Sequence, residues 1–468
     1  MRLDRGIDTL SRFRGSLLGL AAGDALGTTL EFSPPGSFEP IDDMVGGGPF
    51  ALEPGQWTDD TSLALCLASS LVETGRLDPV DQLERYVRWY REGHLSSTGR
   101  LVDIGNATRA ALERFERTGD PQAGSTAPAT AGNGSLMRLA PVPLLFAASE
   151  DAASAAAAES SLTTHGAPAA VDACRYFGQL VARAVRGAAK EQVLAPVELG
   201  LVPEVAAVAA GSFREKEPPA IRGSGYVVES LEAALWAFAR SDSFREGALR
   251  AVNLGDDADT TGAVYGQLAG AFYGEHGVPA EWREQLALRE TIEELADGLF
   301  RRSGLVPTPE SFWIEPRRLL AGKYAGASEP AEAARRVRAL AVAGITLVVD
   351  LTHAGDGLPP YESLLPPEVR RLSVPVPDFS APSGVQLEQV LDAIDAELAR
   401  GGAVYVHCWG GCGRTGAAVA SWLVRRGLDA DAALARFGEL SRPVCGRPCP
   451  EVPAQLELVW EYAARRGR

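Results

Sequence analysis

Residues 403–415 read AVYVHCWGGCGRT, and this stretch decides the fold of the last third of the chain. The apolar run at 403–406 predicts a buried strand, and the glycines after it let backbone N–H groups turn inward around a tetrahedral anion. Arg414 adds a planar two-pronged donor, and a helix from Thr415 directs its positive end at the same point. Both features favour the thiolate of Cys408, so the stretch predicts a phosphate-binding loop with a nucleophile at its base.

The residues of this loop receive separate roles. The expected phosphate contacts are Trp409, Gly410, Gly411, Cys412, Gly413 and Arg414. His407 would hold the loop by side-chain hydrogen bonds, and Thr415 would donate a hydrogen bond to the Cys408 sulfur as it leaves. Cys412 is either a small filler or a thiol that traps an oxidised Cys408 as a reversible disulfide. The alternative for the whole stretch is a glycine-rich turn with a buried, inert cysteine.

The pattern His-Cys-x-x-Gly-x-x-Arg-Thr resembles the signature of the cysteine-dependent tyrosine and dual-specificity phosphatases. On that resemblance Asp378 is the general acid, which protonates the leaving oxygen and then activates water against a phosphocysteine. Without it, Asp378 is an aspartate in a proline-bracketed turn. The resemblance implies an α/β domain with a small parallel sheet at 312–468 and no cofactor. The β-branched run Ile345–Asp350 predicts one of its buried strands.

A different chemistry is indicated by two clusters of acids and hydroxyls in the first three hundred residues. They are Trp57-Thr-Asp-Asp-Thr61 and Gly255-Asp-Asp-Ala-Asp-Thr-Thr261, and each precedes a long apolar helical segment. Hard divalent cations prefer such oxygen ligands, and carboxylates this dense repel one another unless a positive charge lies between them. Two facing clusters would form a two-metal site. The alternative is helix N-capping, for which Asp and Thr are common residues.

Glycines recur every four residues beside both clusters, namely Gly15, Gly19, Gly23 and Gly27 in one series and Gly262, Gly266, Gly270 and Gly274 in the other. Each series would line one ridge of a helix. A glycine inside a helix costs roughly 1 kcal/mol relative to alanine, so the series needs a compensating reason. Bare ridges let neighbouring backbones approach closely. We therefore predict two tightly packed central helices that position the acidic cluster before Gly262.

Six ordered motifs over residues 11–300 resemble the ADP-ribosylglycohydrolase family, which includes dinitrogenase-reductase-activating glycohydrolase. They start at Gly15, Trp57, Ser97, Gly132, Thr164 and Gly255. The resemblance implies an all-α domain at 1–303, followed by a linker at 304–311. It also implies two Mg²⁺ or Mn²⁺ ions in this domain. Their ligands would be Thr58, Asp59, Asp60, Asp257, Asp259 and Thr260.

The same resemblance assigns further residues to catalysis and to ADP-ribose. Glu31 would assist the attack of water, the alternative being an ordinary loop carboxylate. Asp103 would face the leaving group, where an acidic side chain suits the guanidinium of ADP-ribosyl-arginine better than serine. The other expected ADP-ribose contacts are Gly105, Asn133, Gly134, Ser135 and His165. For His165, the alternative is a structural histidine.

Composition limits the partners. The net charge of −16 argues against non-specific nucleic-acid binding. No charged-then-apolar leader follows Met1, and no apolar run reaches membrane-spanning length. Six cysteines are too few for a disulfide scaffold, and Cys445-Gly-Arg-Pro-Cys449 lacks the partners of a zinc site. We therefore expect a cytoplasmic protein that binds neither nucleic acid nor membrane.

Together the motifs predict a bifunctional hydrolase. One domain would release ADP-ribose from a modified protein or an ADP-ribose derivative, and the other would cleave phosphomonoesters of a protein or a small molecule. Two alternatives remain open. One half could be a binding module, either an ADP-ribose reader or a phosphate-binding pseudo-phosphatase. Both sites could also act in sequence on a phosphorylated ADP-ribose.

Overall fold

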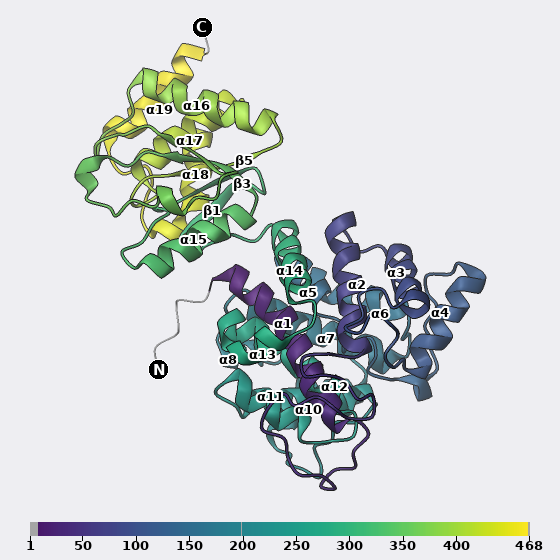
Figure 1. Cartoon of the computed structure of the whole chain (residues 1–468). Helices are drawn as coiled ribbons and strands as arrows, with labels where there is room; N and C mark the ends of the chain where they lie inside the picture. Colours follow the sequence, from purple (N-terminus) through teal and green to yellow (C-terminus); the bar gives the residue numbers. More distant parts are fainter. Residues whose placement is uncertain (1–7, 198, 467–468) are drawn as a thin grey trace. The chain divides into compact units, whose positions relative to one another are not determined.

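The computed structural model of the chain describes residues 8–197 and 199–466, and it divides into two compact units, Met1–Ser303 and Gly304–Arg468 (Figure 1). In the described part of the first unit, the regular structure is helical, and strand-like pairing is limited to isolated bridges such as Gly47–Leu52. This agrees with the expected helical domain. Its α-helices are α1 (Thr9–Gly27), α2 (Asp59–Thr74), α3 (Pro79–Glu92), α4 (Asn106–Thr118), α5 (Pro141–Leu145), α6 (Glu150–Leu162), α7 (Pro168–Val185), α8 (Lys190–Val193), α9 (Pro203–Ala209), α10 (Val227–Ala239), α11 (Phe244–Val252), α12 (Ala258–Tyr273), α13 (Ala280–Gln285) and α14 (Arg289–Ser303).

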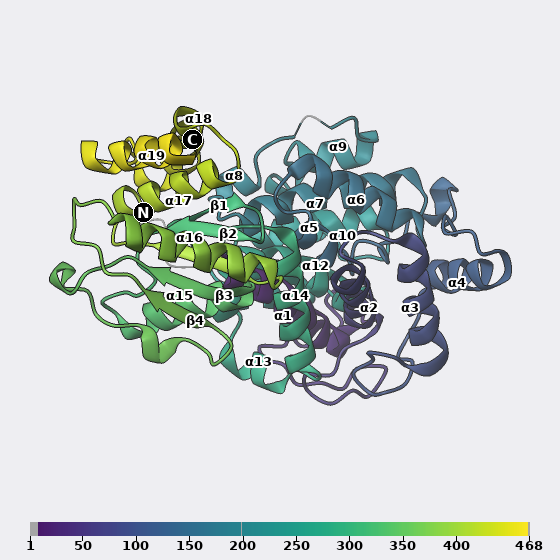
Figure 2. The same ribbon diagram turned by 90° about the horizontal axis from the view of Figure 1, so that it is seen from above.

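Helices α1 and α12 form the centre of this unit, where they run side by side (Figure 1 and Figure 2). Their glycine ridges face each other. A Cβ atom added to Gly23 would lie 2.0 Å from Gly262 O, and one added to Gly266 would lie 1.9 Å from Gly19 O. Both distances are far below a normal contact, so only glycine permits this backbone approach. The close packing predicted from the four-residue spacing is confirmed.

The ends of two helices bring the acidic motifs together. Helix α2 begins after Thr58 and ends at Thr74, and it is followed by Gly75 in the left-handed conformation (φ 69°) that glycine tolerates best. Helix α12 begins after Asp257. The acidic motifs therefore occupy the first turns of α2 and α12, where the helix dipole favours negative charge.

The second unit is built on a five-stranded sheet with the order β1-β2-β5-β3-β4. Its strands are β1 (Ser311–Glu315), β2 (Leu319–Gly322), β3 (Ile345–Asp350), β4 (Arg370–Ser373) and β5 (Ala403–His407). The expected parallel sheet is wrong in one respect, because β1 pairs antiparallel with β2 while the other neighbours are parallel. The short connection between β1 and β2 explains this, since a parallel pair needs a long crossover.

Helices cover both faces of the sheet (Figure 1). Side chains of α16 (Gly384–Ala399), α17 (Gly413–Arg425), α18 (Ala430–Cys445) and α19 (Pro453–Arg466) share one apolar core with the strands. On the opposite face, Val337 and Leu340 of α15 (Pro330–Val342) pack against strand side chains such as Val348. None of the helices in the described residues combines the length and apolar character needed to span a bilayer.

Candidate active sites

Asp24 is the organising residue of the acidic region in the helical unit. It lies fully buried on α1 and accepts four hydrogen bonds from the start of α2. Thr58 donates from its backbone N–H (3.0 Å) and its hydroxyl (2.9 Å), and Thr61 does the same (3.0 and 2.7 Å). Asp24 therefore fixes the beginning of α2 on α1. The sequence analysis assigned it no role, although it is the single acid in the glycine-rich helix.

The expected metal ligands converge at this point. The Thr58 hydroxyl, which is buried, lies 3.1 Å from Asp259 Oδ2 and 3.4 Å from Asp60 Oδ2, so the two helix starts meet there. Asp24, Asp60 and Asp259 each offer an oxygen within 4.8 Å of the others, and Glu31, Asp257 and Asp259 form a second such group. These five residues and Asp59, which lines the same cavity and whose pKa is raised by burial and by charges that include those of Asp259 and Asp24, form what we call the acid cluster: Asp24, Glu31, Asp59, Asp60, Asp257 and Asp259.

The chemistry of this cluster fits divalent cations. Burial, together with the neighbouring carboxylates, raises the pKa of Asp59, Asp60 and Asp259 well above the ordinary value. Asp60 Oδ1 is buried without a hydrogen-bond partner. Within the described residues, no Lys or Arg side chain forms an ion pair with the six carboxylates. Buried carboxylates need such compensation, and two groups of oxygen donors supply a suitable environment for two ions.

A cavity of about 550 Å³ opens above the acid cluster. Its walls include Asp59, Asp60, Asp257, Asp259 and Thr260, whereas Thr58 does not line it. Glu31 also lines it and is 5 % exposed, which argues against an ordinary loop carboxylate. Its Oε2 accepts hydrogen bonds from the N–H groups of Ala258 (2.9 Å) and Asp259 (3.4 Å). Glu31 therefore caps α12 within the acid cluster.

Most of the expected ADP-ribose contacts line the same cavity. Asp103, which has a left-handed backbone (φ 53°), lines it together with Gly105, Asn133 and Gly134, and Gly105 directly precedes α4. Asn133 donates from Nδ2 to Asp257 Oδ2 (2.9 Å). Ser135 is different, because it is absent from the cavity wall and its hydroxyl accepts a hydrogen bond from Ser161 (2.8 Å).

His165 lines the cavity as a neutral side chain. Burial and the charge of Arg138 lower its pKa to about 3. Its Nδ1 lies 2.9 Å from the Thr164 hydroxyl, and a Cβ at Gly134 would come within 2.7 Å of its Cε1. The imidazole is therefore held against the 132–135 loop. It can offer a neutral hydrogen bond but no positive charge.

In the second unit, β5 ends at His407 and delivers Cys408 to the base of the loop at 408–414, which we call the phosphate loop. Cys408 is 3 % exposed and lines a cavity of about 440 Å³. Trp409, Gly410, Gly413 and Arg414 also line this cavity, whereas Gly411 and Cys412 do not. Gly411 has φ 69°, and a Cβ there would lie 2.5 Å from the backbone of Gly322. The loop is thus pressed against the end of β2.

Arg414 is held by two acidic side chains. It is 2 % exposed, and Nη1 donates to Asp356 Oδ2 (2.7 Å) and to Val376 O (2.8 Å). Its Nη2 lies 3.0 Å from Asp378 Oδ1, and the expected general acid and the expected nucleophile line the same cavity. Asp356 was not predicted, because it lies in the 353–361 loop, where no motif marks it.

His407 supports the phosphate loop from below, and burial lowers its pKa. Its Nδ1 lies 3.2 Å from Cys408 O and its Nε2 lies 2.7 Å from the Tyr361 hydroxyl. For a neutral ring, the Cys408 carbonyl assigns the proton to Nδ1, and Nε2 is then an acceptor for the Tyr361 hydroxyl, which also lies 3.3 Å from Asp350 Oδ2. The Thr415 hydroxyl is buried without a hydrogen-bond partner beside this loop and is absent from the cavity wall.

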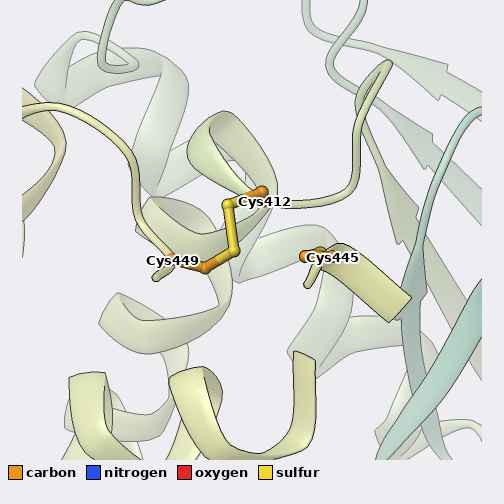
Figure 3. A group of neighbouring side chains, drawn as sticks. All are labelled: Cys412, Cys445 and Cys449. Atoms are coloured by element: carbon orange, nitrogen blue, oxygen red, sulfur yellow. A yellow bond between two sulfur atoms is a disulfide. The ribbon is translucent and has the colours of Figure 1, made fainter. Parts of the chain in front are cut away.

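Cys412 is not available to Cys408. It forms a disulfide with Cys449, and Cys445 lies beside this pair (Figure 3). The hypothesis that Cys412 traps an oxidised Cys408 is therefore wrong for this structure, because Cys449 already occupies its sulfur. Cys449 is 37 residues away in the sequence, and no motif links the two positions.

Comparisons with known proteins find relatives for both units. The sequence model of the ADP-ribosylglycohydrolase family matches residues 5–308. An ADP-ribosylarginine hydrolase, Tri1, of Pseudomonas putida is 49 % identical over 294 residues, which cover 63 % of this chain and 79 % of the relative. An ADP-ribosyl-[dinitrogen reductase] glycohydrolase of Rhodospirillum rubrum is 33 % identical over 309 residues, 63 % of this chain and 97 % of the relative.

One solved structure, an ADP-ribosylglycohydrolase-related protein complex, is 49 % identical with a TM-score of 0.57 and covers 63 % of this chain and 99 % of that chain. Residues 325–428 match the model of a DSP-PTPase phosphatase from polymorphic toxin systems. That match contains Asp378, Cys408 and Arg414 and ends before Cys445 and Cys449. This chain is therefore a hydrolase that belongs to the ADP-ribosylglycohydrolase family and carries a DSP-PTPase-like phosphatase domain after it.

Proposed function

We propose that the helical unit cleaves the glycosidic bond between ADP-ribose and arginine side chains of proteins, and that it uses two divalent cations. The observation that carries this proposal is the acid cluster, in which two groups of carboxylates share Asp259 and Asp60 Oδ1 has no hydrogen-bond partner. The names of the relatives support the arginine linkage. Asp103 also supports the arginine linkage, because its negative charge acts within the cavity, where burial and this charge raise the pKa of Asp59 and Asp257.

Each side of the cluster has its own part. Asp60 and Asp259, with Asp24 behind them, would hold one ion, and Asp257 and Asp259 with Glu31 would hold the other. When bound, the two ions would hold the ribose hydroxyls and polarise the attacking water. Asp103 would accept hydrogen bonds from the guanidinium, and Asn133 with the neutral His165 would orient the ribose and phosphate groups. The wider apolar cavity of about 1010 Å³, which shares Asn106 and Gly132 with this one, leaves room for the rest of the ligand.

The test is release of ADP-ribose from ADP-ribosyl-arginine protein and from ADP-ribosyl-serine peptide, with Mg²⁺, with Mn²⁺ and with chelator. We expect metal-dependent release from the arginine conjugate. Asp60→Asn should abolish it, whereas Asp256→Asn should not, because Asp256 lies next to the cluster but faces Arg222 (3.7 Å). Binding of ADP-ribose without any release would favour a reader module. Release from the serine peptide alone would contradict the role of Asp103.

For the second unit, we propose phosphomonoester hydrolysis through a phosphocysteine. The carrying observation is that Cys408, Arg414 and Asp378 line one cavity, with Nη2 of Arg414 bound to Asp378. An incoming phosphate would replace Asp378 on Nη2, while Asp356 keeps Nη1 in place. The Cys408 sulfur then bonds to phosphorus, and the leaving oxygen takes a proton from Asp378. Asp378 next removes a proton from water, whose oxygen displaces the sulfur and releases phosphate, and the Thr415 hydroxyl donates to the departing sulfur.

Leaving-group dependence tests this mechanism. Asp378→Asn should lose activity on aryl phosphates with poor leaving groups and keep it on those with good ones, because only the former need the proton. Cys408→Ser should lose turnover on all of them and still bind vanadate through the loop N–H groups and Arg414. Equal loss on both substrate types in Asp378→Asn would contradict the general-acid role. Anion binding without turnover in the wild type would identify a pseudo-phosphatase.

A further inference from the structure

Three cysteines from separate positions in the sequence meet at the phosphate loop, and we call them the cysteine cluster: Cys412, Cys445 and Cys449 (Figure 3). Cys412 belongs to the loop and precedes α17, while Cys445 ends α18 and Cys449 follows a turn at Gly446. The three sulfur atoms lie within 4.8 Å of one another, and two of them form the disulfide. A free thiol beside a disulfide is the arrangement that thiol–disulfide exchange needs.

Cys445 differs from the other two in its access to solvent. It is half-buried and lines the cavity that contains Cys408, whereas Cys412 is fully buried and Cys449 is 8 % exposed. Its S–H group also reaches Gly410 O (3.7 Å) and Gly411 O (3.8 Å), two carbonyls of the phosphate loop. A small thiol that enters the cavity therefore meets Cys445 before it meets the disulfide.

We propose that the cysteine cluster is a thiol–disulfide exchange site, at which Cys445 connects the buried Cys412–Cys449 disulfide to small thiols in the cavity. The Cys445 thiolate attacks Cys449 Sγ, the new Cys445–Cys449 bond forms, and the Cys412–Cys449 bond breaks. The electron pair leaves on Cys412, which takes up the proton that Cys445 lost. A dithiol reductant then opens the Cys445–Cys449 bond, gives both sulfurs protons and is itself oxidised to a disulfide.

The direction of attack follows from the position of Cys412. It is the residue before α17, so the positive end of a 13-residue helix stabilises its thiolate. The thiol with the more stable thiolate leaves faster, which makes Cys412 the preferred leaving group. The exchange therefore frees the phosphate loop while Cys449 stays attached to Cys445.

The charges around Cys445 set its pH dependence. Burial raises the pKa of its thiol to about 11; Lys323 and Arg447 act to lower it, and Cys408 and Glu451 to raise it. A small fraction is thiolate at neutral pH, so exchange is slow there and accelerates as the pH rises towards that value. If the phosphatase function proposed above holds, release of Cys412 loosens the loop and weakens phosphate binding. That consequence rests on the proposed function, whereas the exchange does not.

The test uses the full chain with Cys408→Ser, which removes the competing thiol, and maps cross-links by alkylation and mass spectrometry during reduction with glutathione and with dithiothreitol. We expect a Cys412–Cys449 cross-link at the start and a transient Cys445–Cys449 cross-link during reduction. Adding Cys445→Ser should slow the opening of Cys412–Cys449 several-fold, and Cys66→Ser, which removes a buried thiol of the helical unit, should not.

Two results would overturn the proposal. One is free, alkylatable Cys412 and Cys449 in protein purified without reductant. The other is an unchanged rate of reduction in the Cys445→Ser variant. Because the cross-links are read without turnover, a chain that shows them but releases no phosphate in the wild-type form would contradict only the phosphatase function. A wild-type chain that releases phosphate but shows neither cross-link would contradict only the exchange.

Discussion

Gly266→Ala tests whether the contact between α1 and α12 builds the acid cluster. The added Cβ would lie 1.9 Å from Gly19 O and 2.5 Å from Gly19 C. Both atoms belong to the backbone, so no side chain can rotate away. The helices must part by about 1.1 Å before the contact reaches 3.0 Å, the limit below which Cβ atoms essentially never approach.

The expected cost follows from two opposing effects. Overpacking a close-packed interior costs about 1–3 kcal/mol. Alanine gains back about 1 kcal/mol of helix propensity. Because a backbone is the obstacle, we place the overpacking cost at or above its upper end and expect a net loss of about 2 kcal/mol or more. Metal sites tolerate errors of only about 0.2 Å in ligand distance, so metal binding should weaken as well, since Asp24 and Asp259 lie on the two separated helices.

The assay is urea unfolding of the wild type and the variant, together with the rise in Tm that Mn²⁺ produces in each. Gly178→Ala in α7 is the matched control, because its nearest contacts are 3.2 Å away. It should change stability and the metal response much less. If Gly266→Ala unfolds at the wild-type urea concentration and responds normally to metal, the glycine contact does not position the acid cluster and the reasoning fails.

Three further predictions concern single side chains. Asp60→Asn should raise Tm in chelator, because a buried unpaired acid is lost. It should also remove the rise in Tm that metal produces, a stabilisation of about 2.7 kcal/mol at a metal concentration one hundred times Kd. Calorimetry would measure both effects, and Asp256→Asn should behave as the wild type. The wild type should lose stability as the pH falls from 6.5 towards 3, because the histidine of the unfolded chain binds a proton in this range and the buried His165, with its pKa lowered to about 3, does not. His165→Gln should remove this loss. Identical pH profiles of the two proteins in urea unfolding would refute the prediction. Asp356→Asn should weaken the affinity for phosphate or vanadate roughly tenfold or more, because a charge-assisted hydrogen bond worth about 1.5–3 kcal/mol no longer holds Arg414. The control is Glu362→Gln, since Glu362 pairs with Arg371 instead. Equal affinities of Asp356→Asn and the wild type would contradict the positioning role.

Local signals predicted much of this molecule. The β-branched run Ile345–Asp350 is a buried strand with the expected bounds, because its composition suits a sheet covered on both faces. The four-residue glycine spacing predicted a ridge, and the structure shows that ridge packed on its partner. Strand β4 was not predicted, since Arg370–Ser373 is polar and partly exposed at the sheet edge, so it lacks an apolar pattern.

Contacts between residues far apart in the chain could not be predicted from the sequence. Asp24 could not be recognised as the residue that joins α1 to α2 until both helices were placed, although a lone acid among buried glycines and leucines was a usable signal. Asp356 and Arg414 meet across 58 residues, and Cys412 meets Cys449 across 37. Such contacts depend on how the chain returns to a site, which neither spacing nor composition expresses.

The central claim is that one chain carries two independent hydrolytic sites. The most direct measurement follows both products, ADP-ribose from ADP-ribosyl-arginine protein and phosphate from an aryl phosphate, for the wild type, Asp60→Asn and Cys408→Ser. The account predicts that Asp60→Asn loses only metal-dependent ADP-ribose release and that Cys408→Ser loses only phosphate release. Loss of both products in either single variant would contradict it.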